Sequence, residues 1–297
     1  MSNKHAYLIM AHHELYILKS LIKTLDHVRH DFYIHIDKKS FIKKDDLLNV
    51  VKESNIYFTE QTDVHWGGYS QINAELILLE SATKNDQYAY YHLLTGVDLP
   101  LKSPDYILRF FDECGDLEFI SMNNWQEKDL ERVLFRYPFQ DKLKRGFWEK
   151  KIRRFGILWQ RLIKYKRSKE NIKYGIGSAY FDITDKLARY VCSKKEWIEN
   201  TFKETFCADE VFLQTIFLNM ENPNKRFISN YKDTFIEKTY QDVLRAIDWK
   251  RGDPYTYTME DYDFLISSEY LFARKFSSSK DKKLIDSIVD SINTNKL

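Results

Sequence analysis

Apolar and polar positions alternate in blocks along the first 125 residues. Short apolar runs that are typical of buried strands lie at 6–10, 32–36, 56–58, 88–94 and 119–122. Helices are predicted between these runs. Apolar residues recur at helical spacing in 14–27, residues 70–82 form a strongly apolar helix, 104–111 form a short one, and 45–52 form a polar one. Strands that alternate with helices predict βαβ units, a mostly parallel sheet and ligands bound at the carboxyl ends of its strands.

The second half of the chain has a less regular pattern. A turn and strand are expected at 177–184, followed by helices at 187–200 and 209–219, a helix at 259–266 after a Thr258 cap, and a closing helix after Ser277. No G-x-G-x-x-G follows the first strand and no P-loop is present, so the fingerprints of dinucleotide and P-loop nucleotide binding are missing.

Composition narrows the class of protein. The 297 residues are 43% hydrophobic and 15% aromatic, which indicates a folded globular chain. A net charge of +2 argues against nucleic-acid binding driven by bulk charge. Three cysteines without a C-x-x-C pair predict reduced thiols rather than a zinc site or disulfide framework. The first apolar run is too short for a signal peptide or a membrane span, so we expect a cytoplasmic protein.

Residues 142–173 form a basic stretch, with thirteen Lys or Arg interleaved with aromatic residues. One apolar face is predicted from residues spaced three and four apart: Trp148, Ile152, Phe155, Trp159, Leu162 and Ile163. Such a helix can lie on the inner face of an anionic membrane. It can equally pack on the protein core with a solvated basic face, and the sequence leaves both readings open.

Seven segments along the chain share residues with one enzyme family. They read AYLIMAHH (6–13), YIHIDKK (33–39), VHWGGYS (64–70), LTGVDLPLK (94–102), GSAYF (177–181), DE (209–210) and LFARKF (271–276). In this order they resemble the core-2/I-branching glycosyltransferases, which include mucin-type β-1,6-N-acetylglucosaminyltransferases and peptide xylosyltransferases.

The resemblance implies an α/β fold of the GT-A glycosyltransferase type in a single catalytic domain over residues 1–297. Residues 1–125 would form the nucleotide-binding half, 126–276 the acceptor-binding and catalytic half, and 277–297 a C-terminal helix. The chain lacks the membrane anchor, stem and paired cysteines of animal members, so we expect a bacterial enzyme.

The implied reaction is inverting transfer of a sugar from a UDP-sugar to a glycan hydroxyl, without metal or other cofactor, in surface polysaccharide or glycoconjugate synthesis. N-acetylglucosamine is the first choice of sugar. UDP-xylose, UDP-galactofuranose or another donor, a metal-dependent transferase, a catalytically silent glycan-binding protein, and a membrane- or nucleic-acid-binding module remain alternatives.

Glu210 matches the catalytic base of the family. Its neighbours Phe206, Val211 and Phe212 are expected to desolvate its carboxylate and raise the pKa toward neutrality. From spacing alone, Asp209 and Glu210 are better explained as first-turn acids that complement a helix dipole. The resemblance favours the catalytic role.

Cations are expected to replace the metal at the donor diphosphate. By resemblance these are Arg251 and Lys275, with Lys250 or Arg274 as substitutes for Arg251. The single Asp-x-Asp, Asp261-Tyr262-Asp263, falls in a predicted helix, where alternate carboxylates point about 200° apart, so we do not expect it to bind metal.

The remaining predicted contacts lie at the ends of strands. The predicted donor-binding residues are Ala11, His12, His13, Asp37, Lys38, Lys39 and Trp66, in addition to Arg251 and Lys275. Weaker predictions for the acceptor are Asp98, Tyr180 and Asp209, where Asp98 is equally explained as a turn residue. His35 is expected to be a core histidine, and Gly67 and Gly68 to permit a tight turn.

Overall fold

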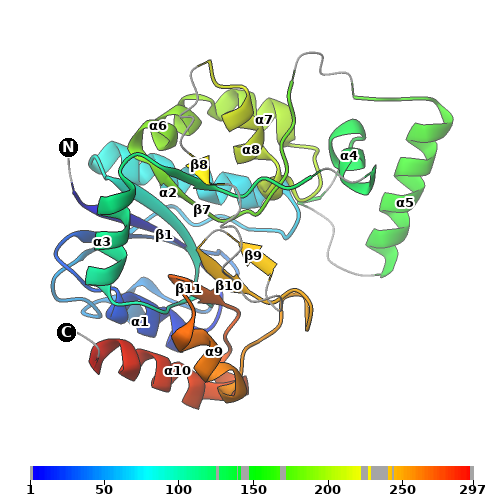
Figure 1. The fold of residues 1–297 in the computed structure, drawn as a ribbon. Coiled ribbons are helices and arrows are strands. Elements are labelled where there is room, and N and C mark those ends of the chain that lie inside the picture. Colours follow the sequence, from blue (N-terminus) through cyan, green and yellow to red (C-terminus); the bar gives the residue numbers. More distant parts are fainter. Residues whose placement is uncertain are drawn as a thin grey trace.

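A computed structural model describes residues 3–124, 127–138, 140–141, 147–167, 172–221, 227–228, 240–242 and 244–294 (Figure 1). In this part of the chain the main sheet has seven strands in the order β3-β2-β1-β4-β7-β6-β8. They are β1 (His5–Ala11), β2 (His30–Ile36), β3 (Asn55–Phe58), β4 (Tyr90–Thr95), β6 (Glu118–Ile120), β7 (Phe181–Thr184) and β8 (Phe227–Ile228).

The main sheet is mostly parallel, as predicted. The pairs β1–β2, β1–β4, β2–β3 and β6–β8 are parallel, whereas β7 is antiparallel to both β4 and β6. The carboxyl ends of β1, β2 and β4 therefore lie along one edge, where the predicted donor-binding residues begin. This arrangement, with helices on both sides, confirms the predicted α/β class (Figure 1).

A smaller sheet lies beside the main one and brings the C-terminal segment to it. Its order is β5-β11-β10-β9, with β5 (Leu99–Pro100), β9 (Tyr240–Asp242), β10 (Arg245–Ile247) and β11 (Phe272–Arg274). β10 and β11 are parallel, and β5 joins β11 directly after the loop that follows β4. Residues near 275 are thereby held close to the ends of the first strands.

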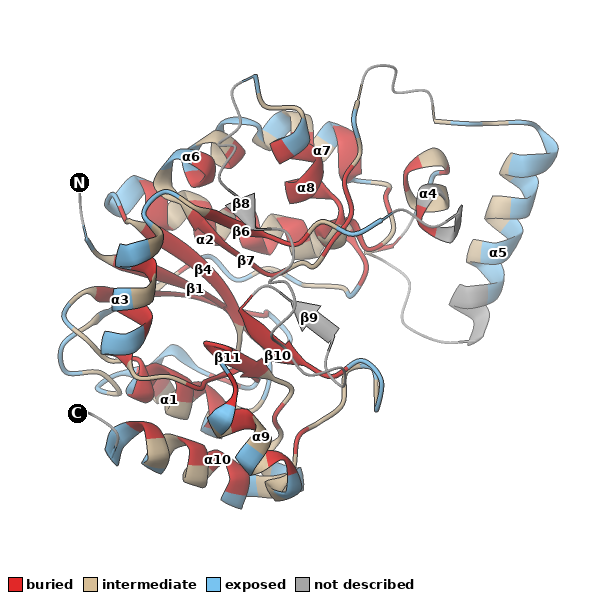
Figure 2. Cartoon of the chain, viewed as in Figure 1, coloured by how far each residue is buried: buried red, intermediate tan, exposed pale blue. Residues whose placement is uncertain are grey.

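Two hydrophobic cores cover opposite faces of the main sheet, because side chains along a strand alternate between faces. In β1, Tyr7 and Ile9 join one core and Ala6 and Leu8 join the other. The first core includes α1 (Leu15–Thr24), α3 (Pro104–Cys114), α9 (Tyr262–Ser267) and α10 (Ser278–Thr294). The second includes α2 (Tyr69–Asn85), α6 (Asp185–Ser193), α7 (Lys195–Phe202) and α8 (Phe212–Leu218) (Figure 2).

The structure departs from the predicted elements at several places, and the helices expected at 209–219 and 259–266 each begin with a 3₁₀ turn. The polar helix expected at 45–52 is only a 3₁₀ turn, η1 (Lys44–Leu47), because Leu47 is its sole buried residue and little apolar surface holds a longer helix. The helix expected at 187–200 is divided into α6 and α7 at Lys194, whose φ of −101° and ψ of 11° leave the helical region. Two further helices, α4 (Glu127–Leu134) and α5 (Phe147–Leu162), lie in the middle region.

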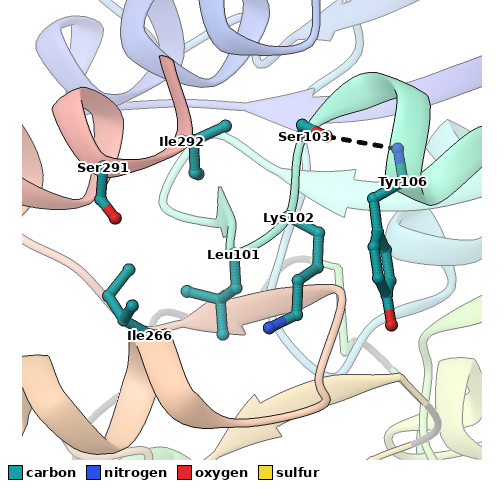
Figure 3. Close-up of a pocket in the computed structure, with 7 residues that line it drawn as sticks. All are labelled: Leu101, Lys102, Ser103, Tyr106, Ile266, Ser291 and Ile292. Atoms are coloured by element: carbon teal, nitrogen blue, oxygen red, sulfur yellow. Dashed lines mark hydrogen bonds between the residues drawn. The ribbon is translucent and has the colours of Figure 1, made fainter. Parts of the chain in front are cut away.

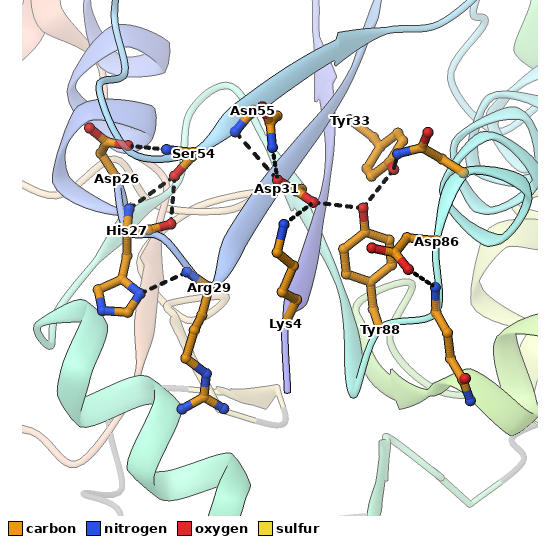
Figure 4. A network of polar contacts seen from close by, with 12 residues as sticks. Lys4, Asp26, His27, Arg29, Asp31, Tyr33, Ser54, Asn55, Asp86 and Tyr88 are labelled. Atoms are coloured by element: carbon orange, nitrogen blue, oxygen red, sulfur yellow. Dashed lines mark hydrogen bonds and ion pairs between the residues drawn. The ribbon is translucent and has the colours of Figure 1, made fainter. Parts of the chain in front are cut away.

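A buried polar network fixes the strands at the amino ends of the sheet (Figure 4). Asp31 on β2 is 1% exposed and accepts hydrogen bonds from Tyr88 Oη at 2.8 Å and Asn55 Nδ2 at 2.8 Å. Lys4 Nζ lies 3.4 Å from the same carboxylate. This network ties β2 to the segments that begin β1, β3 and β4, at the end opposite to the predicted site. Among the described helices, none has the length and apolar character needed to cross a membrane.

Candidate active site

The predicted donor-binding residues gather where β1 and β2 end. Asp37 N donates to Ala11 O at 2.8 Å, so the two strand ends are joined by backbone. His12 and His13 are exposed, and their ring centroids are 3.9 Å apart. Asp37 is 7% exposed, and its Oδ1 accepts from Lys39 N at 2.8 Å, which shapes the loop that presents Lys38 and Lys39 to solvent.

Lys275 approaches this edge from the other end of the chain. It follows β11 and is half-buried, and Phe272 and Phe276 on either side of it in the sequence are both fully buried. Phe276 N donates to Val97 O at 3.1 Å and Ser277 Oγ donates to Glu14 Oε1 at 2.7 Å, so the segment with Lys275 lies beside the loops that follow β4 and β1. Burial lowers the pKa of His12 and of His13, and the positive charge of Lys275 contributes to lowering both. In the described part of the chain Lys275 forms no ion pair with a carboxylate. The edge therefore carries a cation that can meet a phosphate.

Arg251 is a poorer candidate for the diphosphate than the sequence indicated. Its guanidinium forms ion pairs with Asp248 and with Asp261 Oδ1, the latter at 2.8 Å, and lies 4.0 Å from the centre of the Tyr255 ring. Two carboxylates already neutralise this cation, so contact with a diphosphate would require exchange of partners. The substitute Arg274 is also engaged, since its Nε lies 3.5 Å from Asp98 Oδ1.

The ion pair with Arg251 also gives a structural role to Asp261, the first carboxylate of the Asp-x-Asp sequence. Asp261 ends a 3₁₀ turn, η3 (Met259–Asp261), and its Oδ2 accepts from Thr258 N at 2.9 Å in a capping box. Asp261 thus serves a helix cap and an ion pair. Within the described residues, no three His, Cys, Asp or Glu side chains gather in a way that could hold a metal ion.

Glu210 lies on a short turn that is held by the rest of the fold. The turn η2 (Ala208–Glu210) follows Cys207, whose φ of 46° is in the left-handed region. Gly177 N donates to Glu210 O at 2.9 Å, and a Cβ on Gly177 would lie 1.9 Å from Ser121 O, so only glycine fits beside the turn. The GSAYF segment thereby positions the backbone of the candidate base.

The Glu210 side chain is 39% exposed and forms an ion pair with Arg132 Nη1. Arg132 belongs to α4 and also lies 3.5 Å from Asp129. Part of the Glu210 carboxylate thus faces solvent, and a guanidinium lies against it. Sequence reasoning missed Arg132, since nothing in the local pattern of 127–134 links it to a residue 78 positions away.

Burial acts instead on the neighbouring carboxylate. Asp209 is 8% exposed, and burial, followed by the negative charge of Glu210, raises the pKa of Asp209 to about 7. Behind it, Glu75 on α2 is 2% exposed, and burial, followed by the charge of Asp209, raises its pKa well above the ordinary value. Two buried acids thus lie behind the exposed one.

Gln71 on α2 links the turn that carries Glu210 to the turn that carries Trp66. Its Nε2 donates to Asp209 Oδ2 at 3.0 Å, and its Oε1 accepts from Gly67 N. Cys207 N in turn donates to Gly67 O at 2.9 Å. Gly67 has a φ of +75°, and a Cβ there would lie 2.9 Å from the Phe206 ring, so the glycine permits both the predicted turn and this close approach.

Trp66 is 53% exposed, and its ring centroid lies 5.7 Å from that of Phe206. This contact places the predicted donor-binding tryptophan beside the segment that leads to Glu210. The two turns therefore form one unit, although they are far apart in sequence.

The three residues suggested for the acceptor are buried in this structure. Asp98 is 1% exposed and accepts from Thr95 N and Thr95 Oγ1, each at 2.7 Å, so the structure favours its turn role over a sugar contact. Tyr180 is 7% exposed, with the guanidinium of Arg274 4.9 Å from its ring centre. Asp209 is enclosed as described above. His35 is a core histidine as expected, bonded to Thr62 Oγ1 at 2.8 Å.

A separate pocket lies away from these residues, between the start of α3 and the helices α9 and α10 (Figure 3). Its lining includes Lys102, whose ammonium donates to Ser268 O, and Ser103, whose Oγ accepts from Tyr106 N at 3.3 Å. These groups serve the local fold, and none of the predicted site residues lines the pocket.

Comparison with known proteins gives a consistent result. The chain is 22% identical over 299 residues to xylosyltransferase 2 of Canis lupus familiaris, covering 95% of this chain and 33% of that protein. It is 24% identical over 311 residues to a β-1,3-galactosyl-O-glycosyl-glycoprotein β-1,6-N-acetylglucosaminyltransferase of Bos taurus, covering 93% and 66%. The chain thus spans about a third of the length of the xylosyltransferase.

Among solved structures, the apo form of mouse xyloside xylosyltransferase 1 aligns with a TM-score of 0.38 and 10% sequence identity, over 91% of this chain and 96% of that one. This structural similarity is too low to support a conclusion about the chain. The decisive match is to the family described as "Branch: Core-2/I-Branching enzyme", which extends over residues 5–268. The chain therefore belongs to the Core-2/I-Branching enzyme family.

Proposed function

We propose that this protein is an inverting, metal-independent glycosyltransferase that moves a sugar from a UDP-sugar to a hydroxyl of a glycan. The family points to a glycosyltransferase of the core-2 or xylosyltransferase type. The proposal is supported by two groups from distant segments of the chain. Glu210 offers a carboxylate that is 39% exposed, and Lys275 offers a half-buried cation directly after β11.

In the proposed reaction the Glu210 carboxylate accepts the proton of the acceptor hydroxyl as its oxygen attacks the anomeric carbon. The new carbon–oxygen bond forms on the face opposite the UDP group, so the configuration inverts. The bond to the β-phosphate oxygen breaks, and its electron pair leaves with UDP. Arg132 holds the carboxylate in place from the α4 side.

Charge develops on the diphosphate as that bond breaks, and Lys275 is the residue we propose to stabilise it. Arg251 supplies the second cation only if it leaves Asp248 or Asp261, which makes Lys275 the primary candidate. The uridine would contact the loop after β2, where Asp37, Lys38 and Lys39 lie, and Trp66 would contact the donor.

We propose N-acetylglucosamine as the transferred sugar and a lipid-linked glycan on the cytoplasmic side of the cell membrane as the acceptor. Transfer would serve surface polysaccharide or glycoconjugate synthesis. Xylose is the second candidate donor, because several of the similar proteins are named as xylosyltransferases.

The test is a panel of UDP-sugars, assayed for protection of the protein against thermal unfolding and for release of UDP. We expect one UDP-sugar to protect the protein, and Glu210→Gln to retain that protection while losing about 10²–10⁴-fold in turnover. Glu199→Gln is the matched control, since Glu199 lies on α7, has a side chain that is 46% exposed, and pairs with Lys203. A Glu210→Gln variant with more than about a tenth of wild-type turnover would remove Glu210 from this role.

A further inference from the structure

The helix α5 stands apart from the body of the protein and presents an apolar side to solvent (Figures 1 and 2). Phe155 is 70% exposed and Leu162 is 76% exposed. Four neighbours are each more than half exposed: Ile152, Leu158, Trp159 and Ile163. At about 100° per residue these six side chains span an arc of roughly 140° on one side of the helix.

The opposite side of α5 is anchored to the protein, which fixes the direction of the apolar side. The Arg153 guanidinium lies 4.3 Å from the centre of the Phe206 ring. Gln160 Nε2 donates to Arg136 O at 2.9 Å, and Gln160 Oε1 accepts from Arg136 N at 2.9 Å. Rotation of the helix to bury its apolar side would break these contacts. The reading in which this helix packs its apolar face on the core is therefore wrong for the described residues.

The charge on and beside this face is mostly positive, although α5 also contains Glu149. The segment from Lys150 to Arg167 contains eight Lys or Arg and no Asp or Glu. Lys151, Arg154 and Lys164 are exposed, and Arg161 is exposed while paired with Glu131. A second copy of the chain would bring two positive faces together, which charge repulsion disfavours. An anionic surface with an apolar interior matches both properties of the face.

We propose that α5 docks on a membrane that contains anionic lipids, lying in the plane of the interface. Phe155, Trp159 and Leu162 would enter the boundary between headgroups and acyl chains, and Lys151 and Arg154 would contact lipid phosphates. The helix has 16 residues and carries several charges, so it lies on the bilayer rather than crossing it.

Docking through α5 would also orient the candidate active site. Phe206, which contacts Arg153, is followed directly by the turn that carries Glu210. The acceptor side would therefore face the membrane, where a lipid-linked glycan presents its hydroxyls. This last step rests on the proposed function, whereas the membrane contact itself does not.

The test is flotation of the full chain with vesicles of phosphatidylcholine, with or without about one third phosphatidylglycerol. We expect binding to the anionic vesicles at least tenfold stronger than to the neutral ones, with a loss of at least tenfold in 0.5 M salt. The double variant Phe155→Ser/Leu162→Ser should lose at least tenfold in affinity, since two exposed apolar anchors are removed. Phe41→Ser/Leu48→Ser is the matched control, because Phe41 is 98% and Leu48 is 56% exposed elsewhere, and it should bind within about twofold of wild type.

A charge variant, Lys151→Glu/Arg154→Glu, tests the same face without removing apolar contacts and should also lose at least tenfold on anionic vesicles. This charge variant tests membrane docking if Phe155→Ser/Leu162→Ser does not fold. Glu210→Gln should bind vesicles like wild type, which separates failure of docking from failure of the catalytic proposal. The proposal is overturned if wild type does not bind anionic vesicles, if both face variants bind as wild type does, or if the face mediates self-association that Phe155→Ser/Leu162→Ser abolishes.

Discussion

Two adjacent carboxylates, Asp209 and Glu210, have different surroundings, and this difference makes one of them the candidate base. Glu210 is open to solvent and paired with Arg132, so a substrate hydroxyl can reach it. Asp209 is enclosed, bonded to Gln71, and has a pKa raised to about 7 by burial and then by the charge of Glu210. The sequence identified the pair but did not predict the burial of Asp209, because this burial depends on α2, which lies 120 or more residues earlier.

Lys275→Ala tests the cation that we propose to replace a metal. Its charge should interact more strongly with the transition state than with the ground state, so kcat should fall by about 10²-fold or more. UDP affinity should fall as well, because the product carries the same diphosphate. The control is Lys282→Ala, since Lys282 is exposed and pairs with Asp286 on α10. Normal kcat and an unchanged Kd for UDP in Lys275→Ala would show that Lys275 is only a surface residue.

His30 predicts a dependence of stability on pH. Burial lowers its pKa from 6.5 in the unfolded chain to about 3 in the folded protein, where its Nδ1 lies 2.7 Å from Leu25 O. Between these two values the unfolded state binds more protons, so the free energy of unfolding falls as the pH is lowered. Urea unfolding of His30→Asn should show a decline that is smaller by about 2 kcal/mol between pH 6.5 and 4.5. Parallel pH curves for the two proteins would contradict this assignment.

At the scale of secondary structure, the sequence predicted most of the first half correctly, because period-two and helical patterns are local. It could not predict the link between the turn at Gly67 and the turn at Cys207. That link depends on Gln71, Gly67 and Phe206, which meet only when α2 packs against the second half. For the same reason the suggested acceptor residues, Asp98 and Tyr180, were not recognised as buried.

Gly67→Ala tests whether these two turns act as one unit. Gly67 has a φ of +75°, and the added Cβ would lie 2.9 Å from Phe206 Cε2. Gly115→Ala is the matched control, because Gly115 has a φ of +67° but nothing within 4 Å of the added Cβ. Both changes should cost about 1 kcal/mol in backbone strain, measured by urea unfolding. Gly67→Ala should lower the free energy of unfolding further than Gly115→Ala does, and it should also lower kcat. Equal effects of the two changes would contradict the link between the two turns.

At the scale of the whole molecule, a buried charge network joins the two sheets. Arg245 on β10 donates to Asp182 on β7 at 2.7 and 2.9 Å, and Asp182 Oδ1 lies 2.8 Å from His92 Nδ1 on β4. His92 continues to His5 on β1 at 2.9 Å. The network crosses four strands and holds the smaller sheet, and with it Lys275, against the ends of the first strands. The sequence did not predict this network, because charged residues within short strands form no local pattern that identifies their partners.

Asp182→Ala should lower the free energy of unfolding by about 3–5 kcal/mol, because it leaves the Arg245 charge buried without its partner. Replacing both residues, as Asp182→Leu/Arg245→Met, should recover much of this loss, since no buried charge remains. Chemical denaturation of the three proteins measures both effects. If the single variant is as stable as wild type, the network does not hold the two sheets together.

The central claim is that Lys275 and its neighbours, rather than a metal ion, stabilise the leaving diphosphate during transfer to an acceptor hydroxyl. The most direct measurement is the initial rate of sugar transfer by the wild-type protein in excess EDTA, compared with the rate after manganese is added back. We predict the same rate, within about twofold, in both conditions, because in the proposed mechanism Lys275 rather than a metal ion stabilises the diphosphate. Loss of transfer in EDTA with full recovery in manganese would contradict the account.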